Sequence, residues 1–366
     1  MKKLLSIVLI GLLQVNFAFM LRADAVECPC HRDIGAELGF IHVLNTGWED
    51  AIVLESDGHF ALVDAGMIGR GPYIVNYLQR RAGSVDVHLD FIIVTHAHID
   101  HISGFEYIIG HPNVTIDRAY LKRKNVETYV CRCSPSWGYC AMDLYLSFIE
   151  NSENNGITLI LDDLDNRVLE LGYMNVTLVN GEPLIGGTTN PESLCQLIEV
   201  GDFRALLLAD VTGEAAETRI FNQVNGTVDF FKVGHHGLRG STGVRLARNL
   251  RPAVAVYTNG SSWEVDSHDI TLGSDPRGIE GFNHLRRVGT VQYVAGDNGG
   301  VMAVFGEYGM EYRAIREFVR SGPVLDFEYR EDIVLRPMTP PTLTFFQRVS
   351  TFFGDVWYSF IGMFGR

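Results

Sequence analysis

A dense group of potential metal ligands lies in THAHIDHISG, residues 95–104, directly after the apolar run 89–94, which has the character of a buried strand. Four side chains there can bind a metal: His96, His98, Asp100 and His101. The first two are two positions apart and share one side if the strand geometry continues, whereas the last two belong to a turn that enters a helix. Imidazole and carboxylate suit zinc and related divalent metals, and two separated pairs of ligands indicate two neighbouring ions. A structural role would explain one histidine, but four such groups are rarely buried together without a partner.

The motif HxHxDH after a strand resembles the signature of the metallo-β-lactamase fold superfamily, and three further segments agree with it. HFALVDAG at 59–66 is similar to an early strand of that family and contains Asp64. LLLADVTGEA at 207–216 is similar to the strand that carries a metal-bridging aspartate, here Asp210. FKVGHHG at 231–237 is similar to the late strand that ends in a histidine ligand. These motifs occur in the family's order and cover most of the chain.

The resemblance implies a role for each of these residues. Metal one is expected to bind His96 and His98, metal two to bind Asp100, His101 and His235, and Asp210 to bridge the two ions. The doubled histidine leaves His236 as the alternative to His235. Asp64 is expected to orient or polarise the cluster from just outside it.

Two divalent ions about 3.5 to 4 Å apart lower the pKa of a bridging water, so hydroxide is available near neutral pH to attack a carbonyl carbon or phosphorus. The metals also stabilise the negative charge that develops, so no side-chain nucleophile is needed. Asp100, Asp64 and His268 are the candidate catalytic residues. His268, in SHDI, could protonate a leaving group or contact substrate, and the alternative is an ordinary surface histidine.

One family feature is absent. The family usually supplies a third histidine for metal one, but the corresponding region here reads GGTTNPESLCQLIEV. The same absence, with KVGHHG and a final strand like VQYVAGDNGGVMAVF, is similar to the branch represented by the hydrolase domain of the bacterial competence protein ComEC. Asn190 and Ser193 lie where that branch carries Asn and Ser, whereas Leu238 replaces its usual Ser. Two zinc ions per chain are expected, metal one is poorer in ligands and could accept manganese, and a true β-lactamase is disfavoured.

Strands and helices alternate along the chain, which indicates a layered α/β architecture. The resemblance implies an αββα sandwich, in which two mixed β-sheets pack together with helices on the outside, over a hydrolase domain at 26–332. Residues 121–156 form an expected insertion with a cysteine-containing loop and a helix at 139–150. This insertion either shapes substrate access or is a disulfide-stapled surface flap.

The composition agrees with a folded protein, because 46% of the 366 residues are hydrophobic and 20% are charged. The net charge of −14 disfavours a strongly basic nucleic-acid surface. Lys122, Arg123 and Lys124 form a short basic run, and such a run is usually a solvated face.

Residues 1–25 resemble a secretory signal: Lys2 and Lys3 precede the apolar stretch 4–13, and Ala-Asp-Ala at 23–25 offers a cleavage site. A secreted or extracytoplasmic protein is therefore expected, with an uncleaved membrane anchor as the alternative. Six cysteines agree with an oxidising compartment and allow three disulfides. Cys195 could equally be a buried free thiol.

The carboxyl-terminal tail is separate from the rest. A proline-containing linker at 333–342 precedes residues 343–366, whose aromatic side chains recur at helical spacing. The aromatic face could lie on a membrane surface, dock onto the body of the protein, or join a second copy.

The leading functional expectation is a secreted metal-dependent hydrolase acting on phosphoesters, either nucleic acid or nucleotide phosphodiesters. The ComEC-like features imply nuclease-type activity, while the acidic charge argues against tight nonspecific DNA binding. The alternative is a secreted binding or membrane-surface protein whose metal site is weakly active or inactive.

Overall fold

The computed structural model describes five main stretches of the chain. They are residues 33–124, 140–182, 190–238, 240–259 and 276–315, together with short pieces at 319–320, 325–326, 335 and 337. The expectations for the signal segment, the loop at 125–139, His268 and the carboxyl-terminal helix fall outside the described residues. Within the described part, no helix is both long enough and apolar enough to cross a membrane.

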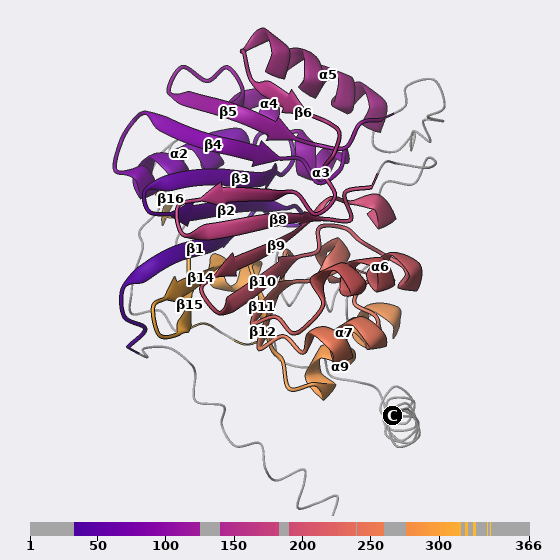
Figure 1. Ribbon diagram of the computed structural model, residues 1–366. Coiled ribbons are helices and arrows are strands. Elements are labelled where there is room, and N and C mark those ends of the chain that lie inside the picture. Colours follow the sequence, from indigo (N-terminus) through magenta and orange to yellow (C-terminus); the bar gives the residue numbers. More distant parts are fainter. Residues whose placement is uncertain are drawn as a thin grey trace, which may run out of the picture.

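Two mixed β-sheets make up the centre of the fold (Figure 1). The eight-stranded sheet has the order β15-β14-β1-β2-β3-β4-β5-β6 and the seven-stranded sheet the order β13-β12-β11-β10-β9-β8-β7. The first contains β1 (Glu37–Leu44), β2 (Ala51–Ser56), β3 (His59–Ala65), β4 (Val87–Ile93), β5 (Val114–Tyr120), β6 (Thr158–Ile160), β14 (Gly300–Gly306) and β15 (Met310–Ala314). The second contains β7 (Val168–Leu171), β8 (Met174–Val179), β9 (Cys195–Val200), β10 (Phe203–Leu207), β11 (Phe230–Lys232), β12 (Val254–Tyr257) and β13 (Val291–Val294). A separate two-stranded sheet pairs β16 (Val319–Arg320) with β17 (Leu325–Asp326).

The strands are apolar on both faces because each sheet is covered on both sides. In β3, Ala61 and Val63 belong to a core shared by the two sheets, whereas Phe60 and Leu62 belong to a core under the outer helices. The second sheet has a matching outer core beneath its own helices. Three apolar layers between four structural layers confirm the predicted αββα sandwich.

The outer helices lie on opposite sides of the sandwich (Figure 1). The first sheet carries α2 (Gly71–Ala82), α3 (Ile99–Ile102), α4 (Phe105–Ile108) and α5 (Ala141–Asn154), and the second carries α6 (Glu214–Val224), α7 (Val244–Leu250) and α9 (Pro276–Arg287). The helix α2 has Pro72 in its first turn and ends at Gly83, whose φ of 61° is the left-handed conformation common after a helix. The helix expected at 139–150 is observed as α5.

The helix expected directly after the metal motif is interrupted. It is observed as α3 and α4, separated at Ser103 and Gly104. A Cβ atom on Gly104 would lie 1.9 Å from the carbonyl oxygen of Ala65, and the Gly104 amide donates a hydrogen bond to the Gly66 carbonyl. The chain must therefore pass close to the end of β3 here, and only glycine permits that approach.

Cys195 is a buried free thiol at the start of β9. Of the two alternatives for Cys195, a disulfide or a buried free thiol, the structure shows the free thiol. The six cysteines therefore do not form three disulfides in this structure. Burial raises the pKa of the Cys195 thiol to about 12, which leaves the thiol protonated and unreactive at neutral pH.

Glu217 on α6 ties that helix to the start of α7. Its carboxylate accepts hydrogen bonds from the Gly243 amide at 3.1 and 2.9 Å. Burial nevertheless raises the pKa of Glu217 from 4.5 to about 7. The folded state therefore binds this proton more tightly than the unfolded state does.

We expect this carboxyl group to make the protein less stable as the pH rises from about 4.5 to about 7, because the folded form holds a proton that the unfolded form releases. Relative to Glu217→Gln, the wild-type protein should lose on the order of 2 to 3 kcal/mol of unfolding free energy across this range. Urea denaturation of both proteins at several pH values, with chelator present, measures the difference. Parallel pH profiles for the two proteins would contradict the assignment.

Candidate metal centre

The potential ligands meet at the carboxyl ends of parallel strands from both sheets. His96 and His98 follow β4, and Asp64 lies at the end of β3. Asp210 follows β10, and the histidine pair at 235–236 follows β11. Because β3 is parallel to β4 and β10 is parallel to β11, each sheet presents these residues at one edge.

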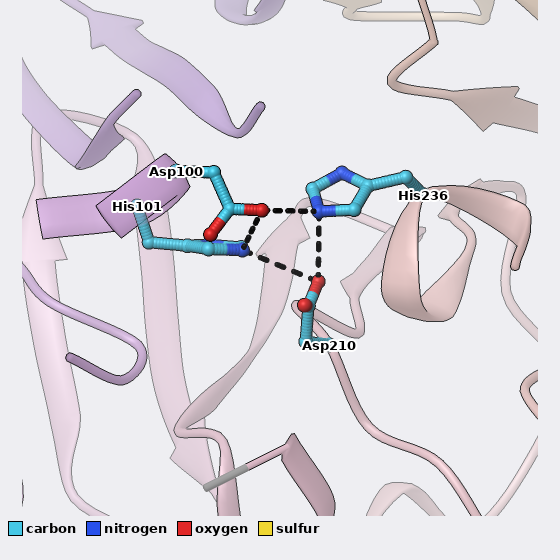
Figure 2. A group of neighbouring side chains, drawn as sticks. All are labelled: Asp100, His101, Asp210 and His236. Atoms are coloured by element: carbon cyan, nitrogen blue, oxygen red, sulfur yellow. Dashed lines mark ion pairs between the residues drawn. The ribbon is translucent and has the colours of Figure 1, made fainter. Parts of the chain in front are cut away.

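One group contains four ligands around the Oδ1 atom of Asp210 (Figure 2). They are Asp100, His101, Asp210 and His236, and their ligand atoms all lie within 4.8 Å of one another. The Nε2 atoms of His101 and His236 each lie 3.3 Å from Asp210 Oδ1. Asp100 Oδ2 lies 3.4 Å from His236 Nε2 and 3.9 Å from His101 Nε2. Two imidazoles and two carboxylates at this spacing match the ligand set of a divalent metal.

A second group faces the other oxygen of the same carboxylate. His96, His98 and Asp210 have ligand atoms within 4.8 Å of one another. The Nε2 atom of His96 lies 3.7 Å from Asp210 Oδ2. Asp210 therefore presents one oxygen to each group, which is the arrangement required of a bridging ligand.

Inward-facing polar atoms in these groups are buried without a hydrogen-bond partner. They are His96 Nε2, His101 Nε2, His236 Nε2 and Asp210 Oδ1. Leaving several such atoms unsatisfied costs free energy that metal coordination would recover. Although burial alone would raise it, the charges of His236 and His101 hold the pKa of Asp210 well below its usual range. Burial, together with His101 and His98, holds the pKa of His96 well below its usual value, so His96 is neutral. An ionised carboxylate and a neutral imidazole are the forms that bind a divalent cation. The neighbouring carboxylates raise the pKa of His101 and of His236, so a metal at the four-ligand group would bind with release of their protons.

Asp64 orients the histidine ligands from behind. Its Oδ2 atom accepts hydrogen bonds from His101 Nδ1 and from the Thr95 hydroxyl, both at 2.7 Å. The Thr95 hydroxyl oxygen also lies 3.1 Å from His96 Nδ1. Protonation of the two Nδ1 atoms leaves the Nε2 atoms of His96 and His101 available for metal. Asp64 thus lies outside the two groups that share Asp210. It belongs to a third group, with Asp50 and His101, whose ligand atoms also lie within 4.8 Å of one another.

Asp50 is a buried functional candidate that the sequence analysis missed. It forms an ion pair with Lys232, accepts a hydrogen bond from the Thr258 hydroxyl at 2.7 Å, and lies 3.2 Å from His236 Nδ1. These contacts orient the His236 ring and join the two sheets beneath the metal groups. Lysine in the apolar run FFKV was the available signal, because a buried lysine requires a partner.

The histidine pair differs from the expected assignment. His236, left as the alternative, occupies the four-ligand group, whereas His235 does not. His235 Nε2 lies 3.8 Å from Asp210 Oδ2, and its side chain is 28% exposed compared with 3% for His236. The cause is the backbone: both residues have positive φ, 47° and 53°, so the chain turns left-handed after β11 and directs His236 inward.

In the region that lacks the family's third histidine, a serine hydroxyl lies near His96. Ser193 Oγ lies 3.5 Å from His96 Nδ1 and donates a hydrogen bond to the Asn190 carbonyl at 2.9 Å. Ser193 thus contacts the outer side of a ligand ring and is not itself in either metal group. Of the predicted site residues, only His268 lies outside the described part of the chain.

Comparisons with known proteins agree with this geometry. The sequence profile of the Metallo-beta-lactamase superfamily matches residues 49–258. ComE operon protein 3 of Bacillus subtilis is 26% identical over 217 residues, covering 55% of this chain and 25% of that protein. Recombination protein 2 of Haemophilus influenzae is 26% identical over 239 residues, covering 63% of this chain and 26% of that protein. The chain therefore spans about a quarter of the length of these relatives.

A partial similarity to a solved structure is also found. The metallo-beta-lactamase fold protein YhfI from Bacillus subtilis is 13% identical, with a TM-score of 0.46. The similarity covers 75% of this chain and 100% of YhfI.

Proposed function

This chain belongs to the metallo-β-lactamase superfamily, and from that premise we propose that it is a secreted hydrolase that uses two divalent metal ions to cleave phosphodiesters. The family predicted from the sequence motifs, including the similarity to ComEC-type competence proteins, is confirmed. The observation that carries the proposal is the division of Asp210 between two groups of ligands, with one carboxylate oxygen facing each.

Two bound divalent ions would supply an acidified water as nucleophile and would neutralise charge that develops on the phosphoryl group. The chain's own residues prepare that site. Asp210 fixes the spacing of the two groups, while Asp64 and Thr95 hold His101 and His96 in the required orientation. Asp100 is the more accessible carboxylate of its group, since its side chain is 24% exposed and that of Asp210 is 2% exposed. Asp100 is therefore the carboxylate best placed to exchange a proton with the reacting groups.

Zinc is the proposed metal, with manganese as a substitute in the group that contains His96 and His98. Three ligands make this group poorer than the other. Phosphodiesters are the proposed substrates because one relative is a recombination protein by name, which favours nucleic-acid chemistry. The net charge of −14 favours short fragments or nucleotides over long duplex DNA. Secretion is proposed from the signal-like segment 1–25.

Chelation followed by metal replacement tests this function. We expect the purified chain to hydrolyse bis(4-nitrophenyl) phosphate, to lose more than 90% of that rate when a chelator removes its metal, and to regain it with zinc or manganese (roughly a tenfold or larger change). A β-lactam and a thioester should be poor substrates under the same conditions. Faster turnover of either one would reject the phosphodiester assignment, and a fully metal-loaded chain without any turnover would favour the binding-protein alternative.

A further inference from the structure

The short basic run after β5 does not lie on the surface as its charge pattern suggested. Lys122 and Lys124 are each only 7% exposed, whereas the side chain of Arg123 is 60% exposed and pairs with Asp162 at 2.6 Å. Residues 119–122 and 124 are all buried, and only the side chain of Arg123 points to solvent.

Hydrogen bonds hold this segment firmly beside the end of β6. The Leu121 amide donates to the Ile160 carbonyl at 3.3 Å, and the Arg123 amide donates to the Leu161 carbonyl at 3.1 Å. The Lys124 amide donates to the Tyr145 hydroxyl on α5 at 3.3 Å, and the Lys124 ammonium lies 5.7 Å from the centre of the Tyr145 ring. Both lysines are therefore fixed by the fold and not by flexible surface contacts.

The two lysines line a small cavity that reaches the metal groups. Its walls come from the end of β4, the segment after β5, α5 and the short helix at Asn190–Glu192. The lining residues include His96, Lys122, Lys124, Tyr145 and Glu192. The cavity volume of about 20 Å³ is enough for one water molecule or one oxygen atom of a larger group. His96, a ligand of the three-residue group, forms part of the same wall.

The charges around the cavity favour an anion. Two lysines and one acidic residue, Glu192, are among the residues that line it. Burial lowers the pKa of Lys122 and of Lys124 to about 8, so both remain mainly protonated at neutral pH. Glu192 and Asp165 raise the pKa of Lys122 and Arg219 lowers it, while Glu192 raises that of Lys124. Burying two like charges beside a metal centre costs free energy, and an anionic oxygen would offset that cost.

We propose that Lys122 and Lys124 form an anion subsite that holds one oxygen of a phosphoryl group next to the metal centre. The subsite rests on the proposed function. It would bind a phosphoryl group of the substrate other than the one being cleaved. The size of the cavity admits an oxygen of that group and excludes a base or a sugar.

Binding of inorganic phosphate to the metal-loaded full chain tests the subsite without relying on turnover. Isothermal titration should show phosphate affinity roughly tenfold or more weaker in Lys122→Met and in Lys124→Met, since each loses one charged contact. Arg123→Met, from the same segment but exposed, should bind phosphate within about twofold of wild type. Metal content and melting temperature are measured for each variant, so that a lost metal or a lost fold is recognised.

Glu192→Gln provides a change of opposite sign. Removing the Glu192 carboxylate should tighten phosphate binding severalfold, an outcome that a purely structural pairing of the lysines with Glu192 does not produce. It also keeps the proposal testable if a lysine variant fails to fold. Unchanged phosphate affinity in both lysine variants, or weaker binding in Glu192→Gln, would overturn the subsite.

Two dinucleotide substrates, one with and one without a terminal phosphate, identify the source of the bound group. If the subsite holds a substrate phosphate, the wild-type chain has the lower KM for the phosphorylated dinucleotide, and Lys124→Met loses that preference with kcat retained. If the subsite holds free phosphate only, the wild-type chain shows no preference between the two dinucleotides. In that case Lys124→Met is inhibited less strongly by phosphate than the wild type, which still supports an anion subsite. Failure of the proposed function would instead appear as no dinucleotide turnover with the phosphate titrations unaffected.

Discussion

Replacing Asp210 with alanine should remove metal binding from both groups and reduce phosphodiester turnover by roughly 10³-fold or more. Each oxygen of this carboxylate faces a different group: Oδ1 lies 3.3 Å from two imidazole nitrogens and Oδ2 lies 3.7 Å from a third. One substitution therefore takes a ligand from two metals at once. No other residue is shared between the group of His96, His98 and Asp210 and the four-ligand group.

Metal content per chain, measured by elemental analysis after dialysis, is the first measurement, and hydrolysis of the generic phosphodiester is the second. Asp210→Asn tests charge separately from shape, because it keeps one oxygen and nearly the same volume; we expect it to retain less than half of the metal (about a twofold or larger loss). Asp202→Ala, in the exposed turn of the β9–β10 hairpin, is the matched control and should leave both quantities unchanged. Retention of wild-type metal content by Asp210→Ala would rule out a bridging role.

The fold could be predicted from the sequence because most strands and helices are visible as local patterns of apolar residues. The doubly buried strands read as continuous apolar runs, and their order matched one architecture. The break between α3 and α4 was missed because it depends on how closely Gly104 approaches Ala65 at the end of β3, a tertiary contact that periodicity does not report.

The sequence identified most of the potential ligands, but it ranked His235 above His236 and did not identify Asp50. The spacing within 95–104 reveals four ligands directly, since they are neighbours in sequence. Asp50 was missed because its partners Lys232 and Thr258 lie 182 and 208 positions away, and only the packed sheets bring them together. Lys122 and Lys124 were taken for a solvated run because a cluster of charges in the sequence does not reveal that α5 and the helix at Asn190–Glu192 cover it.

The doubled histidine is the point at which sequence and structure diverge most, and a pair of alanine variants decides it. His236→Ala should lose the metal of the four-ligand group and at least 100-fold in turnover (roughly the scale for removal of a key metal-site contact). Its Nε2 atom lies 3.3 Å from Asp210 and 3.4 Å from Asp100, and Asp50 supports the opposite side of the ring.

His235→Ala should keep the same number of metals and lose no more than about tenfold in turnover, because His235 lies outside both metal groups and is partly exposed. Both positions have the same left-handed backbone, so the conformational cost of alanine is matched and the difference between the variants reports on ligation. Elemental analysis gives the metal number, and the rise in melting temperature on adding zinc gives an independent measure, since a ligand that binds only the folded state stabilises it. Loss of metal from His235→Ala with full retention in His236→Ala would restore the assignment drawn from the sequence and would require the turn after β11 to direct the other ring inward.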